Sequence, residues 1–160
     1  MKKLISVLLA LVLAIGVFAG CDLLESDPKT FTEGDFTITL NEDFEVSDED
    51  NGYDITFASR TSIVFVLEDS FEYFEEGTTL EEYSQLSLEA NEREELEVKE
   101  GDGYLYVEYN DDVEGEDYYY MVAYYEGSES FWVVNFSTPE VNRSKLGAKF
   151  VTWASSVEVA

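Results

Sequence analysis

The sequence predicts an α+β fold in which helices flank an antiparallel sheet of about seven strands, in the order β-β-β-α-β-β-β-β-α. Three observations support this prediction. Short segments alternate apolar and polar residues, the period of a half-buried strand. Several such segments follow one another with only Gly- and Asp-rich turns between them. Two further segments repeat apolar residues every three or four positions, as a helix packed on a sheet does.

Three strands are expected first. Residues 36–40 (Phe-Thr-Ile-Thr-Leu) alternate apolar and polar side chains. Residues 47–52 are rich in Ser, Asp, Asn and Gly and favour a turn. Tyr53, Ile55 and Phe57 then share one face of a second strand. Residues 63–67 are all apolar, which predicts a third strand covered on both faces.

A helix is predicted over residues 80–91. Thr79 is followed three positions later by Glu82, the spacing of a capping box at a helix start. Apolar residues then recur at three, three and four positions, and Leu88 lies off their stripe. The predicted buried stripe is Leu80, Tyr83, Leu86 and Ala90.

Four strands of an antiparallel meander follow this helix. The first begins at Leu96 and Val98, and the others span residues 104–109, 118–125 and 131–136. Turns are expected at residues 101–103, 111–117 and 127–129. Eight tyrosines fall within this region, and adjacent ones on a strand must point to opposite faces. They either pack across strands under the helices or form an aromatic surface for a sugar or a basic peptide.

The last element is a helix that Thr138 and Pro139 are predicted to open, as N-cap and first helical residue. One face is apolar, and the same helix contains three of the few basic residues. The apolar residues are Leu146, Phe150, Trp153 and Val157, and the basic residues are Arg143, Lys145 and Lys149.

This order of elements over residues 31–160 resembles the PsbP-like fold, which occurs in an extrinsic photosystem II subunit and in a Ran-binding nuclear protein family. The matching stretches are residues 36–40, 79–83, 118–120, 131–132 and 150–154. The resemblance implies an antiparallel sheet with helices against its faces. These stretches are architectural, so the resemblance implies no catalytic residue.

The first twenty residues have the pattern of a secretory signal. Lys2 and Lys3 precede a run over residues 4–18 that is apolar except for Ser6. This run is shorter than the about 20 apolar residues that a membrane-spanning helix needs. Phe18-Ala19-Gly20-Cys21 resembles the lipobox of bacterial lipoproteins, although Phe18 stands where that family usually has Leu. The resemblance implies cleavage between Gly20 and Cys21 and a diacylglyceryl anchor on Cys21. The alternative is an ordinary cleaved signal followed by an incidental cysteine.

The expected organisation is therefore a signal peptide over residues 1–20, a tether over residues 21–30 and one domain over residues 31–160. A chain of 160 residues is long enough for one domain of ordinary size. The localisation that follows is the extracytoplasmic face of a bacterial cell membrane, with the anchor as the contact to the lipid.

Composition excludes several kinds of site. There is no histidine and a single cysteine, which rules out Ser-His-Asp and Cys-His nucleophile systems, disulfides within the chain and Cys/His zinc sites. The formal net charge is −27, and it becomes −29 once residues 1–20 are removed. Such a surface repels nucleic acid and anionic headgroups. A basic protein or divalent cations are the expected partners, unless the acidity is adaptation to a saline medium.

Two acidic runs are candidate sites for calcium, which takes six to eight oxygen ligands. One lies within residues 47–54 and the other within residues 110–117, and neither has the spacing of an EF-hand. The candidate ligands are Asp48, Asp50 and Asp54 in the first run and Asp111, Asp112 and Glu114 in the second. No other cofactor is expected.

The sequence therefore predicts a lipid-anchored extracytoplasmic binding or accessory module, without catalytic residues. The alternative is a carboxylate-dependent hydrolase of cell-envelope material. That chemistry needs two carboxyl groups about 5–9.5 Å apart, one with a raised pKa. With 36 acidic residues, no particular pair stands out.

Overall fold

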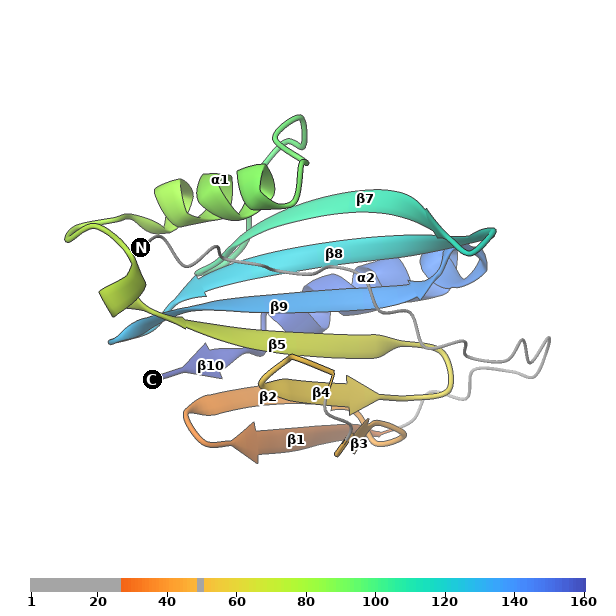
Figure 1. Cartoon of the computed structure of the whole chain (residues 1–160). Helices are drawn as coiled ribbons and strands as arrows, with labels where there is room; N and C mark the ends of the chain where they lie inside the picture. The colour runs from red at the N-terminus through yellow and green to blue at the C-terminus, as the bar shows by residue number, and fades with distance from the viewer. Residues whose placement is uncertain (1–26, 49–50) are drawn as a thin grey trace.

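The computed structural model describes residues 27–48 and 51–160, which form two antiparallel sheets and two α-helices (Figure 1). The predicted α+β class is confirmed, and a second sheet is added to the predicted one. The larger sheet contains seven strands in the spatial order β3 (Glu45–Val46), β4 (Ile55–Ala58), β5 (Ile63–Ser70), β9 (Ser130–Pro139), β8 (Glu116–Glu126), β7 (Leu105–Val113) and β6 (Lys99–Glu100).

The smaller sheet has β2 (Phe36–Asn41) at its centre, with β1 (Pro28–Glu33) on one side and β10 (Glu158–Val159) on the other. Strand β1 includes Pro28, Lys29 and Thr30, which the sequence placed in the tether. Its only apolar position that is buried is Phe31. With so few apolar residues the segment has no clear period of its own, and its pairing with β2 makes it a strand.

Helix α1 (Leu80–Ala90) begins with the predicted capping box: the Glu82 N–H donates to Thr79 Oγ1 (3.2 Å), and the Thr79 N–H donates to Glu82 Oε2 (2.9 Å). The predicted stripe was wrong for two of its four positions, since Tyr83 is buried and Leu80 is partly buried. Leu86 and Ala90 are exposed, and Leu88 is buried. Two small serines lie on the buried face, which is formed by Tyr83, Ser84, Ser87 and Leu88, so helix and sheet can approach closely there.

Helix α2 (Arg143–Ala154) follows a short 3₁₀ helix, η2 (Glu140–Asn142), so the predicted start at Thr138 was wrong. Thr138 belongs to β9, and its hydroxyl donates to the Thr61 carbonyl (2.7 Å) instead of capping a helix. The predicted apolar face is confirmed for Leu146, Phe150 and Trp153, which are buried. Val157 lies beyond the end of α2 and is only partly buried, so its predicted place on the helix was wrong. Within the described residues, no helix is both long and apolar enough to cross a membrane.

Several strand boundaries also differ from the predicted ones. Strand β4 starts at Ile55, two residues after Tyr53, and β6 is shorter than the strand expected from Leu96. Strands β7 and β8 extend through most of the predicted turn over residues 111–117. Only Glu114 and Gly115 form the turn, both with positive φ (55° and 89°), as a two-residue hairpin requires.

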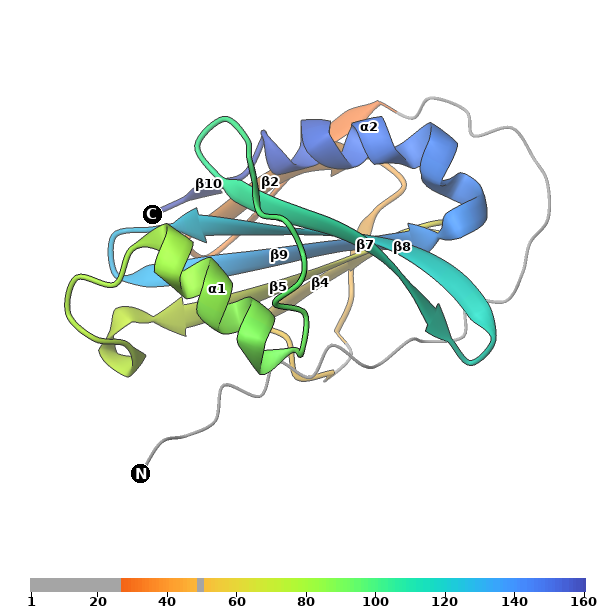
Figure 2. The same cartoon turned by 90° about the horizontal axis from the view of Figure 1, so that it is seen from above.

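The larger sheet is buried on both faces, and Figure 2 shows α1 and α2 on opposite sides of it. On one face, α2 and the smaller sheet cover it; Phe36, for example, stacks on Trp132 with 5.6 Å between the ring centroids. On the other face, Tyr83 of α1 stacks on Phe131 at 4.3 Å.

The tyrosines of β8 alternate between these two cores, as predicted. Tyr119 and Tyr125 point to the α2 side, and Tyr118, Tyr120 and Tyr124 point to the α1 side. All five are buried. They therefore support the packing interpretation of the tyrosine-rich region over the exposed aromatic surface.

Candidate functional site

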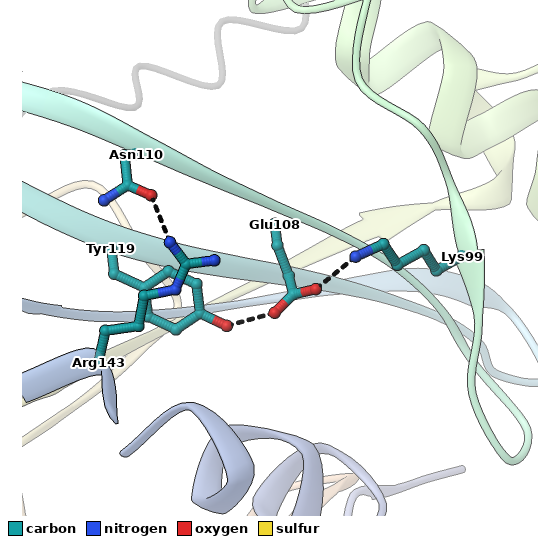
Figure 3. A network of polar contacts seen from close by, with 5 residues as sticks. All are labelled: Lys99, Glu108, Asn110, Tyr119 and Arg143. Atoms are coloured by element: carbon teal, nitrogen blue, oxygen red, sulfur yellow. Dashed lines mark hydrogen bonds and ion pairs between the residues drawn. The ribbon is translucent and has the colours of Figure 1, made fainter. Parts of the chain in front are cut away.

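A network of polar contacts joins β6, β7, β8 and the first turn of α2 (Figure 3). The Glu108 carboxylate accepts hydrogen bonds from Lys99 Nζ (2.6 Å) and from the Tyr119 hydroxyl (2.5 Å). The Arg143 guanidinium lies over the Tyr119 ring, 4.6 Å from its centroid. Arg143 Nη1 also donates to Asn110 Oδ1 (3.1 Å). This network is the candidate functional site because polar and charged side chains from four elements meet there.

Strand register brings these residues together. Glu108 and Asn110 are two positions apart on β7 and therefore share the face that α2 covers. Asn110 lies directly opposite Tyr119 of β8. The amide of Asn110 donates to Glu140 of η2 (2.5 Å), so the segment just before α2 is tied to the same strand.

The contacts shift the pKa values of three groups. Burial opposes ionisation of Glu108, but hydrogen bonds from Lys99 and Tyr119 outweigh it and leave the pKa of that carboxyl lowered. The hydrogen bond to Glu108 raises the pKa of Lys99. Burial, followed by the hydrogen bond and the charge of Glu108, raises the pKa of the Tyr119 hydroxyl. At neutral pH, Glu108 and Lys99 are therefore charged and Tyr119 is protonated.

This arrangement is suited to holding α2 against the sheet rather than to acid catalysis. A general acid needs a proton near neutral pH, whereas Glu108 has a lowered pKa and accepts two hydrogen bonds. Glu108 and Lys99 also form an ion pair with each other. The network therefore gives no support to a hydrolase.

Among the residues that the structure describes, one carboxyl group has a raised pKa, that of Asp69 on β5. Burial is the main cause, and the neighbouring Asp54 adds to it, while the hydrogen bond from Tyr83 acts in the opposite direction. The Tyr83 hydroxyl donates to Asp69 Oδ2 (2.5 Å), which ties α1 to the sheet. The raised pKa therefore follows mainly from burial, and the hydrogen bond from α1 offsets part of it.

A small cavity of about 20 Å³ lies between the end of α1 and the sheet, enough for about one water molecule. Tyr109 is among the lining residues, and its buried hydroxyl has no hydrogen-bond partner among the described residues. Arg93 lies over the Tyr109 ring at 4.2 Å and pairs with Asp111 at 2.5 Å. The cavity is too small for a ligand larger than water.

The candidate metal ligands lie in two separate places. Asp54 precedes β4, and its carboxylate accepts the Glu68 N–H (2.7 Å). Asp48 is exposed and follows β3. Three strands, β5, β9 and β8, separate these residues from the acidic run on β7. The structure therefore does not bring the two runs together.

In the second run, Asp111 pairs with Arg93, and Asp112 Oδ1 accepts the Gly115 N–H (3.2 Å). Glu114 forms the turn and is exposed. Across the described ranges, 27–48 and 51–160, no three or more His, Cys, Asp or Glu side chains form a group that could hold a metal ion. Asp50 lies outside those ranges, as do Gly20 and Cys21 of the lipobox.

Sequence reasoning did not find the network around Glu108. In the sequence, Arg143 stands out only as one of three basic residues of the last helix. The available signal was the alternation of Tyr106, Glu108 and Asn110 along one face of β7. That pattern does not say which strand lies alongside, so it could not pair Glu108 with Tyr119.

The chain is similar in structure to several solved proteins. Cyanobacterial PsbP (CyanoP) from Synechocystis sp. PCC 6803 matches with a TM-score of 0.61 and 16% identity, over 91% of this chain and 98% of that protein. LpqN of Mycobacterium tuberculosis, described as involved in cell envelope biogenesis, matches with a TM-score of 0.52 and 7% identity, over 84% and 91%.

A protein from Bacteroides thetaiotaomicron VPI-5482 matches with a TM-score of 0.58 and 10% identity, over 86% of this chain but only 49% of its own. No protein-family model matches the sequence, and no curated protein matches it. At such low identities these likenesses show the fold alone, and they confirm the predicted PsbP-like architecture.

Proposed function

We propose that this protein is a lipid-anchored, extracytoplasmic binding or accessory module. The observation that carries the proposal is Cys21, directly after Ala19-Gly20 and an apolar run over residues 4–18. Cleavage between Gly20 and Cys21 would make Cys21 the first residue of the mature chain, and the two acyl chains of a diacylglyceryl group on its thiol would hold the protein stably at a membrane. A single cysteine in this position has no other evident use in the sequence.

The fold is compatible with this role. The described domain starts with β1 at Pro28, so only residues 22–27 would separate it from the anchor. Such a tether spans at most about 20 Å, at roughly 3.5 Å per residue. LpqN, which has a similar fold, is described as involved in cell envelope biogenesis. That description supports an envelope location for this chain as well.

The partner we propose is a basic protein that approaches the acidic hairpin, meaning Asp111, Asp112, Glu114, Glu116 and Asp117 at the joined ends of β7 and β8. Glu114, Glu116 and Asp117 are exposed. Concentrated surface charge of one sign accelerates encounter with a partner of the opposite sign. Divalent cations are attracted by the same charge.

Cys21→Ser tests the anchor. We expect the wild-type protein to take up labelled fatty acid and to fractionate with membranes, and the variant to do neither. Ser26→Ala is the matched control, because it changes a nearby residue outside the motif and should behave as the wild type. Fatty-acid labelling of Cys21→Ser would overturn the proposal.

A further inference from the structure

Strand β1 forms an open edge of the smaller sheet. Every residue of β1 is exposed except Phe31. All six residues of β1 pair with strand β2 along one edge of β1. Within the described residues, no strand pairs with the other edge of β1. Figure 1 shows β1 at the lower margin of the molecule. An exposed edge of this length can accept another strand.

The hydrogen-bond pattern shows which peptide groups this edge presents. The Glu42 N–H donates to the Asp27 carbonyl (2.8 Å), at the end of the β1–β2 ladder. Bonded residues alternate along an antiparallel pair, so Lys29, Phe31 and Glu33 direct their peptide groups toward β2. The peptide groups of Thr30 and Thr32 therefore point away from β2, and an added strand would bond to them.

We propose that this edge pairs with β1 of a second copy of the chain, antiparallel, with Phe31 of one copy opposite Phe31 of the other. In this register, Thr30 faces Thr32 of the second copy, and their peptide groups form the new ladder. Lys29 faces Glu33 of the second copy, and Glu33 faces its Lys29. Both ion pairs then lie at non-hydrogen-bonded positions, where side chains approach most closely.

Charge and strand length together select the register. A shift that placed Thr30 opposite Thr30 would put Asp27 opposite Glu33, two like charges that disfavour pairing. The opposite shift, with Thr32 opposite Thr32, would place Thr30 opposite Gly34, beyond the end of the strand. Within β1 one Lys and one Glu cancel, which is unusual in a chain of net charge −27. The strand is therefore complementary to itself.

The same pairing would extend the row of threonines on the outer face of the smaller sheet from one copy into the other. The Thr30 and Thr39 hydroxyls are 2.9 Å apart, and those of Thr32 and Thr37 are 3.1 Å apart. In the proposed pair, Thr30 of one copy lies beside Thr32 of the other, so the rows of threonines join. A two-fold pair uses the edge of both copies and leaves none for a third, and Pro28 has no N–H to extend the ladder.

A strand pair of this length buries less surface than a stable dimer needs in solution. Its strength therefore rests on the proposed function, because anchoring confines the copies to one surface and raises their effective concentration. The short connection between Cys21 and β1 keeps the edge close to the membrane. Pairing is expected between anchored copies rather than in dilute solution.

Crosslinking in membranes tests the register. We would co-express full-length Thr30→Cys and Thr32→Cys chains carrying different affinity tags, and treat the membranes with an oxidant or a short thiol crosslinker. Directly paired residues have Cα atoms about 5.5 Å apart, within the range of a disulfide. We expect about tenfold more crosslinked pairs from the mixture than from either variant alone.

Thr37→Cys with Thr39→Cys is the matched control, because these threonines lie on the same face but on the inner strand β2. The proposal would be overturned if the control pair, or Thr30→Cys alone, crosslinked as much as the mixture of Thr30→Cys and Thr32→Cys. Equal crosslinking of Thr30→Cys to a different protein would also overturn it. No crosslink above background would overturn it too, provided circular dichroism shows the variants folded.

Charge exchange gives an independent measurement. Chains that carry Lys29→Glu alone, or Glu33→Lys alone, should pair with one another less than wild-type chains do. A mixture of the two variants should restore pairing, because each substituted side chain then faces one of opposite charge. Lys145→Glu on α2 changes the net charge by the same amount as Lys29→Glu and should have no such effect. Maleimide labelling of Cys21 reports separately on anchoring. A free Cys21 thiol together with intact pairing would contradict only the proposed anchor. An acylated Cys21 without pairing would contradict only the proposed strand pairing.

Discussion

The Tyr83 hydroxyl donates a 2.5 Å hydrogen bond to the Asp69 carboxylate, connecting the buried face of α1 to β5. The Tyr83 side chain is 1% exposed and stacks on Phe131, so its ring and its hydroxyl both help to position α1. The pKa of the Tyr83 hydroxyl is raised, by burial first and then by the charge of Asp69.

Tyr83→Phe should keep the ring stacking and remove only this hydrogen bond. We expect a loss of about 1.5–3 kcal/mol in the free energy of unfolding, the range for a hydrogen bond to a charged group. Urea unfolding measures it. Tyr73→Phe, at a position 72% exposed, is the control and should leave the free energy of unfolding unchanged.

Leu88→Ala and Leu86→Ala distinguish the two possible buried faces of α1. Leu88 is 3% exposed and Leu86 is 42% exposed. We expect Leu88→Ala to cost about 2–5 kcal/mol and Leu86→Ala less than about 0.5 kcal/mol. Equal costs in thermal or urea unfolding would contradict the helix orientation.

Glu108→Gln should change the acid dependence of stability. The pKa of Glu108 is lowered on folding from its ordinary value of 4.5, so its carboxylate stabilises the folded state above that pH. This contribution is lost as the pH falls toward the lowered value. The difference between wild type and variant in the free energy of unfolding should therefore be largest at about pH 7 and shrink toward about pH 3. A difference that grows in acid would contradict the assignment.

Glu114→Gln with Asp117→Asn tests the acidic hairpin while leaving the Asp111–Arg93 ion pair intact. With polylysine as a basic probe, we expect a lower association rate at low salt and little change in the dissociation rate, because exposed charges act mainly on encounter. Glu75→Gln with Glu76→Gln removes the same charge from the exposed segment before α1 and is the control. Stopped-flow mixing at two salt concentrations measures both rates, and equal effects of the two double variants would remove the hairpin from the proposed function.

Local patterns in the sequence determined much of this protein. Alternation in residues 36–40 and along the Tyr-rich strand depends on neighbouring residues only, since a strand repeats every two positions. The same holds for the capping box of Thr79 and Glu82, and for the apolar face of α2. These features were predicted correctly because their evidence lies within a few residues of chain.

Only the tertiary structure decided which elements lie together. Strand β1 has one buried apolar residue, and its pairing with β2 makes it part of a sheet. Helix α1 buries Ser84 and Ser87 because the sheet approaches them closely, although a hydrophobic pattern would not select serine. Glu108 meets Lys99 and Tyr119 through strand register, and the open edge of β1 follows from the order of strands. Register and strand order depend on contacts between residues far apart in the chain, which local periodicity does not encode.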